Sequence, residues 1–363
     1  MKKLVLAALA IGTMASCTKS NVQYEQPGEM LFKPVSGMLT KAEGNVTYNG
    51  LPFNIWAWWI NPTNSSYNLY IDEGTFAKNQ NNIYQGATVL NNEITHNPYY
   101  WPTTGSLAFA GYSPYNAPAT GSGTEGQENY KAPFVYDYSS STLTVNNYTQ
   151  PHDVAKTVDF MWFDLTKSFT YEDTKTTGVP VVFKHALSKL SFNFQLKDKN
   201  TPQNWTIKKV ELNGIETNSS KFTANGENLK WDTPTAPQNI TVYSHENGCL
   251  LSGDAQQLEN SGNGVIIIPQ SCTPKNGDTS AEAELVVTYD LKTPVGGTLT
   301  SQTVTLPLSA GTEVVGAGAG ATEAISYFWK PGKHYIYTIT FGANEILISP
   351  TVTAWEDKIV TVE

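Results

Sequence analysis

The chain has 363 residues, of which 40% are hydrophobic and 12% aromatic, and this composition excludes an intrinsically disordered protein. The formal net charge is −9, and all 23 basic residues are lysines, so the composition argues against nucleic acid and against an anionic membrane surface as partners. The length predicts about two domains.

The N-terminus has the pattern of a lipoprotein signal peptide, which we assign to residues 1–16. Two lysines precede an apolar segment, Leu4–Ile11, that is too short to span a bilayer. The segment Met14–Cys17 resembles a bacterial lipobox, so we predict lipidation at Cys17 and anchoring to the outer membrane. The alternative is an ordinary signal peptide with an incidental cysteine at this position.

Short strand-like runs bounded by Gly, Pro, Asn and Ser recur along the whole chain, and no long segment has a helical period. In the first half, the expected strands are a segment near Met30–Met38, then Phe53–Trp59, Leu107–Pro114 and Val158–Asp164. The stretch 115–130 contains a Gly-x-Gly-x-x-Gly match, but no strand precedes it and no helix follows it, so we interpret it as a loop. The pattern predicts an all-β protein.

The clearest strand signal lies at mid-chain, in Val179–Leu196. Val179–Phe183 is an apolar run, which is typical of a strand covered on both faces. From Leu190 to Leu196 apolar and polar residues alternate strictly, as in a strand with one buried face. We interpret this stretch as the strand that opens a second domain.

The second half continues in the same manner, with short strands separated by turns. The expected elements are Trp205–Ile215, a hairpin at Lys221–Trp231, Asn239–Tyr243, Gly264–Gln270, Ala283–Tyr289, Thr298–Leu308, His334–Phe341 and Glu345–Val352.

The sequence has no signature of an enzyme, a cofactor or a metal site. None of the five histidines stands in a His-Glu-x-x-His arrangement, and there is no Cys-x-x-Cys pair or Gly-x-Ser-x-Gly elbow. Cys249 and Cys272 either form a disulfide, which export would permit, or remain as buried free thiols, which we favour.

Several of these segments, in this order, resemble motifs of the Bacteroidetes fimbrillin family, the subunits of type V pili. The segments are Phe53–Trp59, Tyr99–Pro102, Tyr112–Pro114, Val158–Asp164, Phe183–Leu190 and Ile268–Gln270. The resemblance implies two tandem transthyretin-like β-sandwich domains. The expected division is a signal peptide at 1–16, an N-terminal propeptide with the first strand at 17–41, domains at 42–177 and 178–344, and a C-terminal strand segment at 345–363.

The resemblance also implies a function. The chain would be a structural and adhesive subunit of a cell-surface fimbrium, exported as a lipid-anchored precursor, with other pilus subunits as partners. In the family a trypsin-like surface protease removes an N-terminal strand, and the positions that look similar here are Lys41 and Ala42, where familiar members carry arginine. The alternative is an uncleaved subunit, such as a non-polymerising pilus anchor.

The candidate donor strand for a neighbouring subunit is the C-terminal segment, because an extended peptide can complete a sheet with a vacant edge. Its apolar positions are Ile346, Ile348, Val352, Ile359, Val360 and Val362. The alternative is that residues 345–352 form the last strand of the subunit's own domain, which leaves residues 358–363 as the better donor.

A second hypothesis is a monomeric surface lipoprotein that binds host or bacterial glycans through exposed aromatic rings. The candidate rings are Trp56, Trp58, Trp59, Tyr99, Tyr100 and Trp101. Core packing is the favoured interpretation for most of them, because aromatic side chains of this size dominate cores.

Overall fold

The structure is a computed structural model that describes residues 28–34, 37–38, 45–46, 50–81, 83–151, 153–165, 167–201, 203–226, 228–260, 264–273, 283–315, 322–343 and 345–355. Strands dominate this part of the chain, which contains one α-helix, α1 (Tyr171–Thr174), and one 3-10 helix, Val154–Lys156. The predicted all-β class is therefore confirmed. No helix among the described residues is long and apolar enough to cross a membrane.

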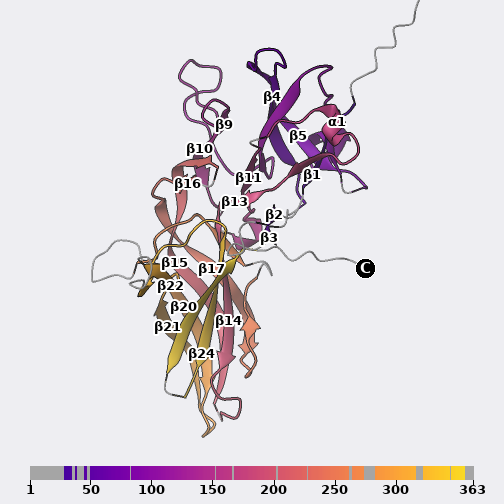
Figure 1. The fold of residues 1–363 in the computed structure, drawn as a ribbon. Helices are drawn as coiled ribbons and strands as arrows, with labels where there is room; N and C mark the ends of the chain where they lie inside the picture. Colours follow the sequence, from indigo (N-terminus) through magenta and orange to yellow (C-terminus); the bar gives the residue numbers. More distant parts are fainter. Residues whose placement is uncertain are drawn as a thin grey trace, which may run out of the picture.

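The first sheet has nine strands and forms an N-terminal lobe at the top of Figure 1. Its order is β12-β1-β6-β5-β4-β8-β11-β13, and β7 pairs with β6. The bounds are β1 (Leu31–Pro34), β4 (Phe53–Ile60), β5 (Tyr67–Lys78), β6 (Tyr84–Leu90), β7 (Glu93–His96), β8 (Ser106–Ser113), β11 (Met161–Asp164), β12 (Val179–Val181) and β13 (Lys184–His185).

The second sheet is organised around one long strand, β15 (Asn204–Asn225), which has 22 residues. The first part of β15 lies between β17 (Thr235–Leu250) and β20 (Glu284–Lys292). Its last part pairs with β10 (Thr142–Thr149) and β16 (Asn228–Trp231). The sheet is completed by β9 (Phe134–Asp137) and β21 (Thr298–Pro307). Residues from the first half of the chain therefore share a sheet with the second half.

The third sheet packs against the first part of the second sheet and completes a C-terminal lobe. Its order is β18-β14-β24-β25, and β19 pairs with β14. The bounds are β14 (Ser188–Leu196), β18 (Gln256–Gln257), β19 (Val265–Ile267), β24 (Lys333–Phe341) and β25 (Ile346–Ala354). Two further hairpins join β2 (Gly37–Met38) to β3 (Asn45–Val46) and β22 (Thr312–Val315) to β23 (Thr322–Ile325).

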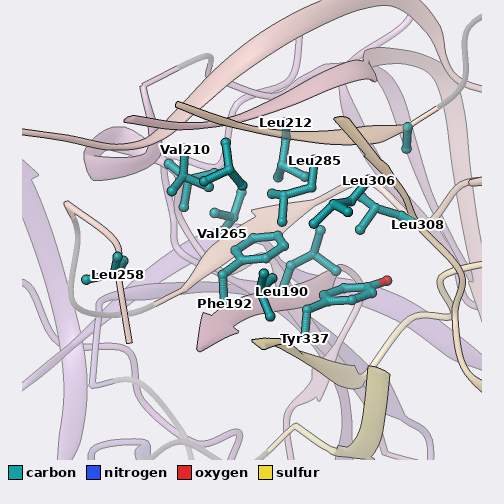
Figure 2. Packing of buried hydrophobic residues seen from close by; sticks show 14 of the residues in the cluster. Leu190, Phe192, Val210, Leu212, Leu258, Val265, Leu285, Leu306, Leu308 and Tyr337 are labelled. Atoms are coloured by element: carbon teal, nitrogen blue, oxygen red, sulfur yellow. The ribbon is translucent and has the colours of Figure 1, made fainter. Parts of the chain in front are cut away.

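The alternation seen in Leu190–Leu196 places its apolar side chains in the core between these two sheets. Leu190, Phe192 and Phe194 are fully buried. Figure 2 shows Leu190 and Phe192 directed toward Leu212 and Leu285 of the facing sheet, beside Tyr337 of β24. The sequence period thus identifies the core face of β14.

The buried residues form three clusters, one in each lobe and one where the lobes meet. This third cluster, the junction cluster, combines residues of the first sheet with residues of the other two. It contains Trp56, Trp58, Tyr112, Phe134, Tyr136, Tyr148, Phe160, Trp162, Ala186, Leu187, Phe222, Ile266, Ile268 and Trp355, among others.

The mid-chain stretch passes from one lobe to the other. Val179–Val181 pairs in parallel with β1, and β13 pairs with β11, so both belong to the first sheet. The chain then joins the third sheet at Ser188. A second domain beginning at residue 178 stays a prediction, and the strand pairing indicates a later crossing, after His185.

Candidate functional site

The candidate site is the slot that holds the N-terminal strand β1 in the first sheet. Leu31 and Phe32 pair antiparallel with β6, while Phe32, Lys33 and Pro34 pair in parallel with β12. Just before the strand, the Met30 N–H donates to the Tyr99 carbonyl over 2.7 Å. Segment 28–34 is therefore bonded on both sides to segments that lie far away in the sequence.

The inward side chains of this segment complete the core of the N-terminal lobe. Met30 and Phe32 are 0% exposed. The ring of Phe32 packs edge-on against Phe53, Phe76 and Phe109, with ring centroids 5.8, 4.7 and 5.1 Å away. Burying two side chains of this size stabilises the lobe by about 3–6 kcal/mol. Removal of the segment would leave a groove lined with aromatic rings.

The side chain of Tyr171 covers the first residue of segment 28–34, Gly28. The ring of Tyr171, at the start of α1, lies so close to Gly28 that a Cβ at this position would be 2.1 Å from Tyr171 Cε2. Helix α1 is fixed by a capping box between Thr170 and Asp173. A side chain at this position would therefore force the Tyr171 ring, which is 37% exposed, to move aside.

Strand β12 depends on β1 for its place in the sheet. It lies at the edge of the sheet, and its recorded strand partner is β1. Val179 and Val181 are nevertheless fully buried in the same core. A strand in the slot is therefore needed to connect β12 to β6, whichever chain supplies it.

The predicted lipidation and processing residues lie outside the described residues, so they stay predictions. They are Cys17, Lys41 and Ala42. In the sequence, Lys41 follows β1 and precedes β4, so a cut there would separate the slot's occupant from the rest of the lobe.

The candidate donor residues divide into two groups. Ile359, Val360 and Val362 also lie outside the described residues. Ile346, Ile348 and Val352 lie in β25, which pairs with β24 from Phe341↔Ile346 to Lys333↔Ala354. Ile346 and Ile348 pack against the core of the C-terminal lobe, while Val352 is 40% exposed. In this structure residues 346–354 are thus the subunit's own last strand, and their use as a donor stays a prediction.

Most of the aromatic residues considered for glycan binding are not available at the surface. Trp56, Trp58 and Trp101 are buried, and Trp59 and Tyr99 are half-buried. Tyr100 is 46% exposed. Stacking on a sugar needs an accessible ring face, so core packing accounts for most of this set.

Cys249 and Cys272 are both free thiols in this structure, so the possible disulfide between them is not formed. Burial raises the pKa of Cys272 to about 12, and burial also raises the pKa of the half-buried Cys249. Both thiols are therefore protonated and unreactive near neutral pH. Among the described residues, no group of three or more His, Cys, Asp or Glu side chains is placed to hold a metal ion.

Sequence reasoning identified a strand near Met30–Met38 but not its role in filling the slot. The local signal is weak, because Leu31 is apolar like its buried neighbours Met30 and Phe32, so the segment shows no alternation of apolar and polar residues. The slot itself is formed by β6 and β12, whose proximity no local pattern reveals.

Comparison with known proteins gives three results. Residues 40–355 match a family model described as Fimbrillin-like, while no curated protein sequence matches the chain. Among solved structures, a fimbrial protein from Bacteroides vulgatus ATCC 8482 shares 16% identity and a TM-score of 0.51, covering 90% of this chain and 99% of that chain. The tip fimbrial protein Mfa3 from Porphyromonas gingivalis, with a C-terminal truncation, shares 10% identity and a TM-score of 0.42, covering 90% and 100%.

Proposed function

Because the chain belongs to the fimbrillin-like family, we propose that it is a subunit of a cell-surface pilus whose precursor carries strand β1 as a temporary occupant of its own sheet. A surface protease of trypsin-like specificity cuts after Lys41 and releases this strand. The C-terminal segment of an incoming subunit then takes its place.

The observation that carries this proposal is the position of β1. The strand lies on the N-terminal side of Lys41, and it is bonded between β6 and β12. An extended peptide suits such a slot because main-chain hydrogen bonds supply affinity and alternate side chains fill the pockets. An interface of this kind joins unlike surfaces of successive subunits, so it produces a filament.

Cleavage is needed because β1 is a better occupant than the candidate donor. Phe32 fills a pocket between three phenylalanine rings, whereas the donor residues Ile359, Val360 and Val362 are smaller. The uncut strand also has the advantage of a covalent tether, which gives it a high effective concentration. A cut removes this tether, so assembly follows processing.

The same cut would release the subunit from the membrane. The proposed lipid is attached to Cys17, in the part of the chain that is removed. The precursor would thus be held at the outer membrane until the moment at which it becomes competent to polymerise.

The proposal is tested by treating recombinant residues 18–363 with trypsin, followed by N-terminal sequencing and unheated, non-reducing gel electrophoresis. We expect a new N-terminus at Ala42 and a ladder of stable multimers. Lys41→Gln is expected to prevent both, whereas the matched control Lys19→Gln behaves as the parent. Deletion of residues 356–363 is expected to leave cleavage intact and to abolish the ladder.

Two outcomes would overturn the proposal. One is a ladder that forms without the loss of residues 18–41. The other is complete cleavage after Lys41 that leaves only monomers, which would indicate a pilus anchor or a monomeric surface protein.

A further inference from the structure

Trp355, at the end of β25, is fixed in the junction between the lobes. Its side chain is 1% exposed and belongs to the junction cluster. Its indole ring is stacked on the imidazole of His185, with ring centroids 4.2 Å apart and planes 6° apart. The Nζ of Lys189 lies 5.7 Å from the centroid of the same indole.

The ring on which Trp355 rests belongs to the other lobe. His185 lies in β13 of the first sheet, opposite Met161. Its Nδ1 is 2.7 Å from Oδ2 of Asp159, and the two atoms are not aligned as in a good hydrogen bond. The two side chains are only 1% and 9% exposed. Trp355 thus links the last strand of the C-terminal lobe to a buried pair of the N-terminal lobe.

The backbone of Trp355 is also hydrogen-bonded at the junction between the lobes. The Trp355 N–H donates to the Gly332 carbonyl over 3.1 Å, and the Gly332 N–H donates to the Leu187 carbonyl over 2.8 Å. Gly332 has a φ of 68°, which glycine adopts without strain. Gly332 is therefore bonded both to Leu187, where the chain crosses between the lobes, and to Trp355, which follows β25.

The anchor is important because the end of β25 next to Trp355 is weakly held: Ile346 and Ile348 pack against the core at the other end of the strand, whereas Val352 is 40% exposed. Strand β25 is the outermost strand of the third sheet and its recorded strand partner is β24. A force applied beyond residue 355 to an unanchored strand would break the pairs one after another, beginning at Lys333↔Ala354. Opening pairs singly requires much less force than moving a packed ring and its neighbours together.

We propose that Trp355 is a mechanical anchor, which transmits tension on the C-terminal segment into the lobe junction and so prevents β25 from peeling away from β24. The importance of this anchor in a filament rests on the proposed function. The anchoring itself is a property of the monomer, so it can be tested on the monomer without any filament.

The test is single-molecule force spectroscopy on the monomer, held by a tag after Glu363 and by a second tag inserted at Gly126, whose surroundings are open. The parent protein is expected to resist until a lobe unfolds. Trp355→Ala is expected to show an additional early step at lower force. This step corresponds to the nine residues of β25, up to about 30 Å of extended strand.

The matched control is Trp231→Ala, because Trp231 also packs in the junction and its Nε1–H donates to the Ala186 carbonyl over 2.7 Å, but it does not lie on the pulled segment. It is expected to lower overall stability without the early step. Trp355→Phe, which can still stack on His185, is expected to suppress the step and keeps the test available if the alanine variant does not fold.

An early step in both alanine variants, or in neither, would overturn the anchor and leave the strand-exchange proposal unaffected. Failure of multimer formation would overturn the strand-exchange proposal and leave the anchor unaffected, because the pulling measurement uses the monomer alone.

Discussion

His334 is a histidine whose surroundings disfavour its charged form. It lies at the start of β24, opposite Lys189, and its Nε2 is 2.9 Å from the Ser191 hydroxyl oxygen. Burial, followed by the positive charge of Lys189, lowers the pKa of His334 to about 4 from an ordinary value of 6.5. The imidazole is therefore neutral in the folded protein at physiological pH.

This shift predicts a loss of stability in acid. Between pH 6.5 and 4 the unfolded chain binds a proton at His334 that the folded protein does not bind, so stability falls as the pH falls through this range. Because the side chain is half-exposed, we expect a contribution of about 1–2 kcal/mol, less than the full shift would give. Urea unfolding at pH 7.5 and 4.5 should show a smaller loss for His334→Gln than for the parent. The carboxylates also lower stability in acid, but they do so equally in both proteins. An equal loss of unfolding free energy in the parent and in His334→Gln would therefore contradict the role of His334.

At the scale of elements, two buried glutamines extend strand pairing beyond the ends of strands. The Gln150 amide donates to the Ile266 carbonyl over 2.6 Å and accepts from the Ile268 N–H over 2.8 Å. The Gln270 amide makes the same pair of contacts with the N–H and carbonyl of Glu216, at 2.9 and 3.0 Å. Each amide therefore takes the place of a peptide group between two segments.

We expect Gln150→Ala to lower the free energy of unfolding by about 2–4 kcal/mol, because it leaves a buried N–H and a buried carbonyl without their partner. Gln195→Ala is the matched control, since Gln195 is half-buried and bonds to a side chain, Thr340. Its cost should stay below about 1 kcal/mol. Urea titration of both variants measures the difference. Equal costs would show that the contacts of Gln150 contribute no more than those of the half-buried Gln195.

The elements also show what the sequence could and could not reveal. The hairpin expected at Lys221–Trp231 is confirmed by the antiparallel pairing of Phe222–Asn225 with β16. Its first strand is not separate from Trp205–Ile215, however, because β15 runs from Asn204 to Asn225 without a break. At Asn213-Gly214 the pairing of β15 with β17 has a bulge, and Gly214 has a φ of 72°. Whether such residues turn or bulge depends on neighbouring strands, which the local pattern does not contain.

The candidate site could likewise be predicted only in part from the local sequence pattern. The alternation in β14 predicted its buried face correctly, because burial of one face is a local property of a strand. The partners of β1 are contributed by Tyr84 and Val179, far along the chain, so only the topology could identify them. The processing site was proposed from resemblance and stays a prediction.

For the whole molecule, the important feature is that the lobes share a sheet and a core. Strand β15 pairs with β20 at one end and with β10 at the other. The junction cluster takes Trp56 and Trp162 from the first sheet and Ile266 and Trp355 from the C-terminal half. Neither lobe can unfold without exposing aromatic surface of the other.

We therefore expect thermal unfolding to be a single cooperative transition. In scanning calorimetry the van't Hoff and calorimetric enthalpies should agree, as they do for a two-state unit. The fragment 28–187 should fail to give a cooperative transition, because it lacks β15, one of the two strands that pair with β10, and half of the junction. Two resolved heat-capacity peaks for the full chain would contradict this view.

The two parallel pairings also affect how the chain reaches its structure. Strand β14 pairs with β24 at a distance of 145 residues along the chain, and β1 pairs with β12 across much of the N-terminal half. Contacts of such long range slow folding, because the entropy of closing the loop is lost before the contact stabilises it. During synthesis, neither lobe can close until its distant strand has been made.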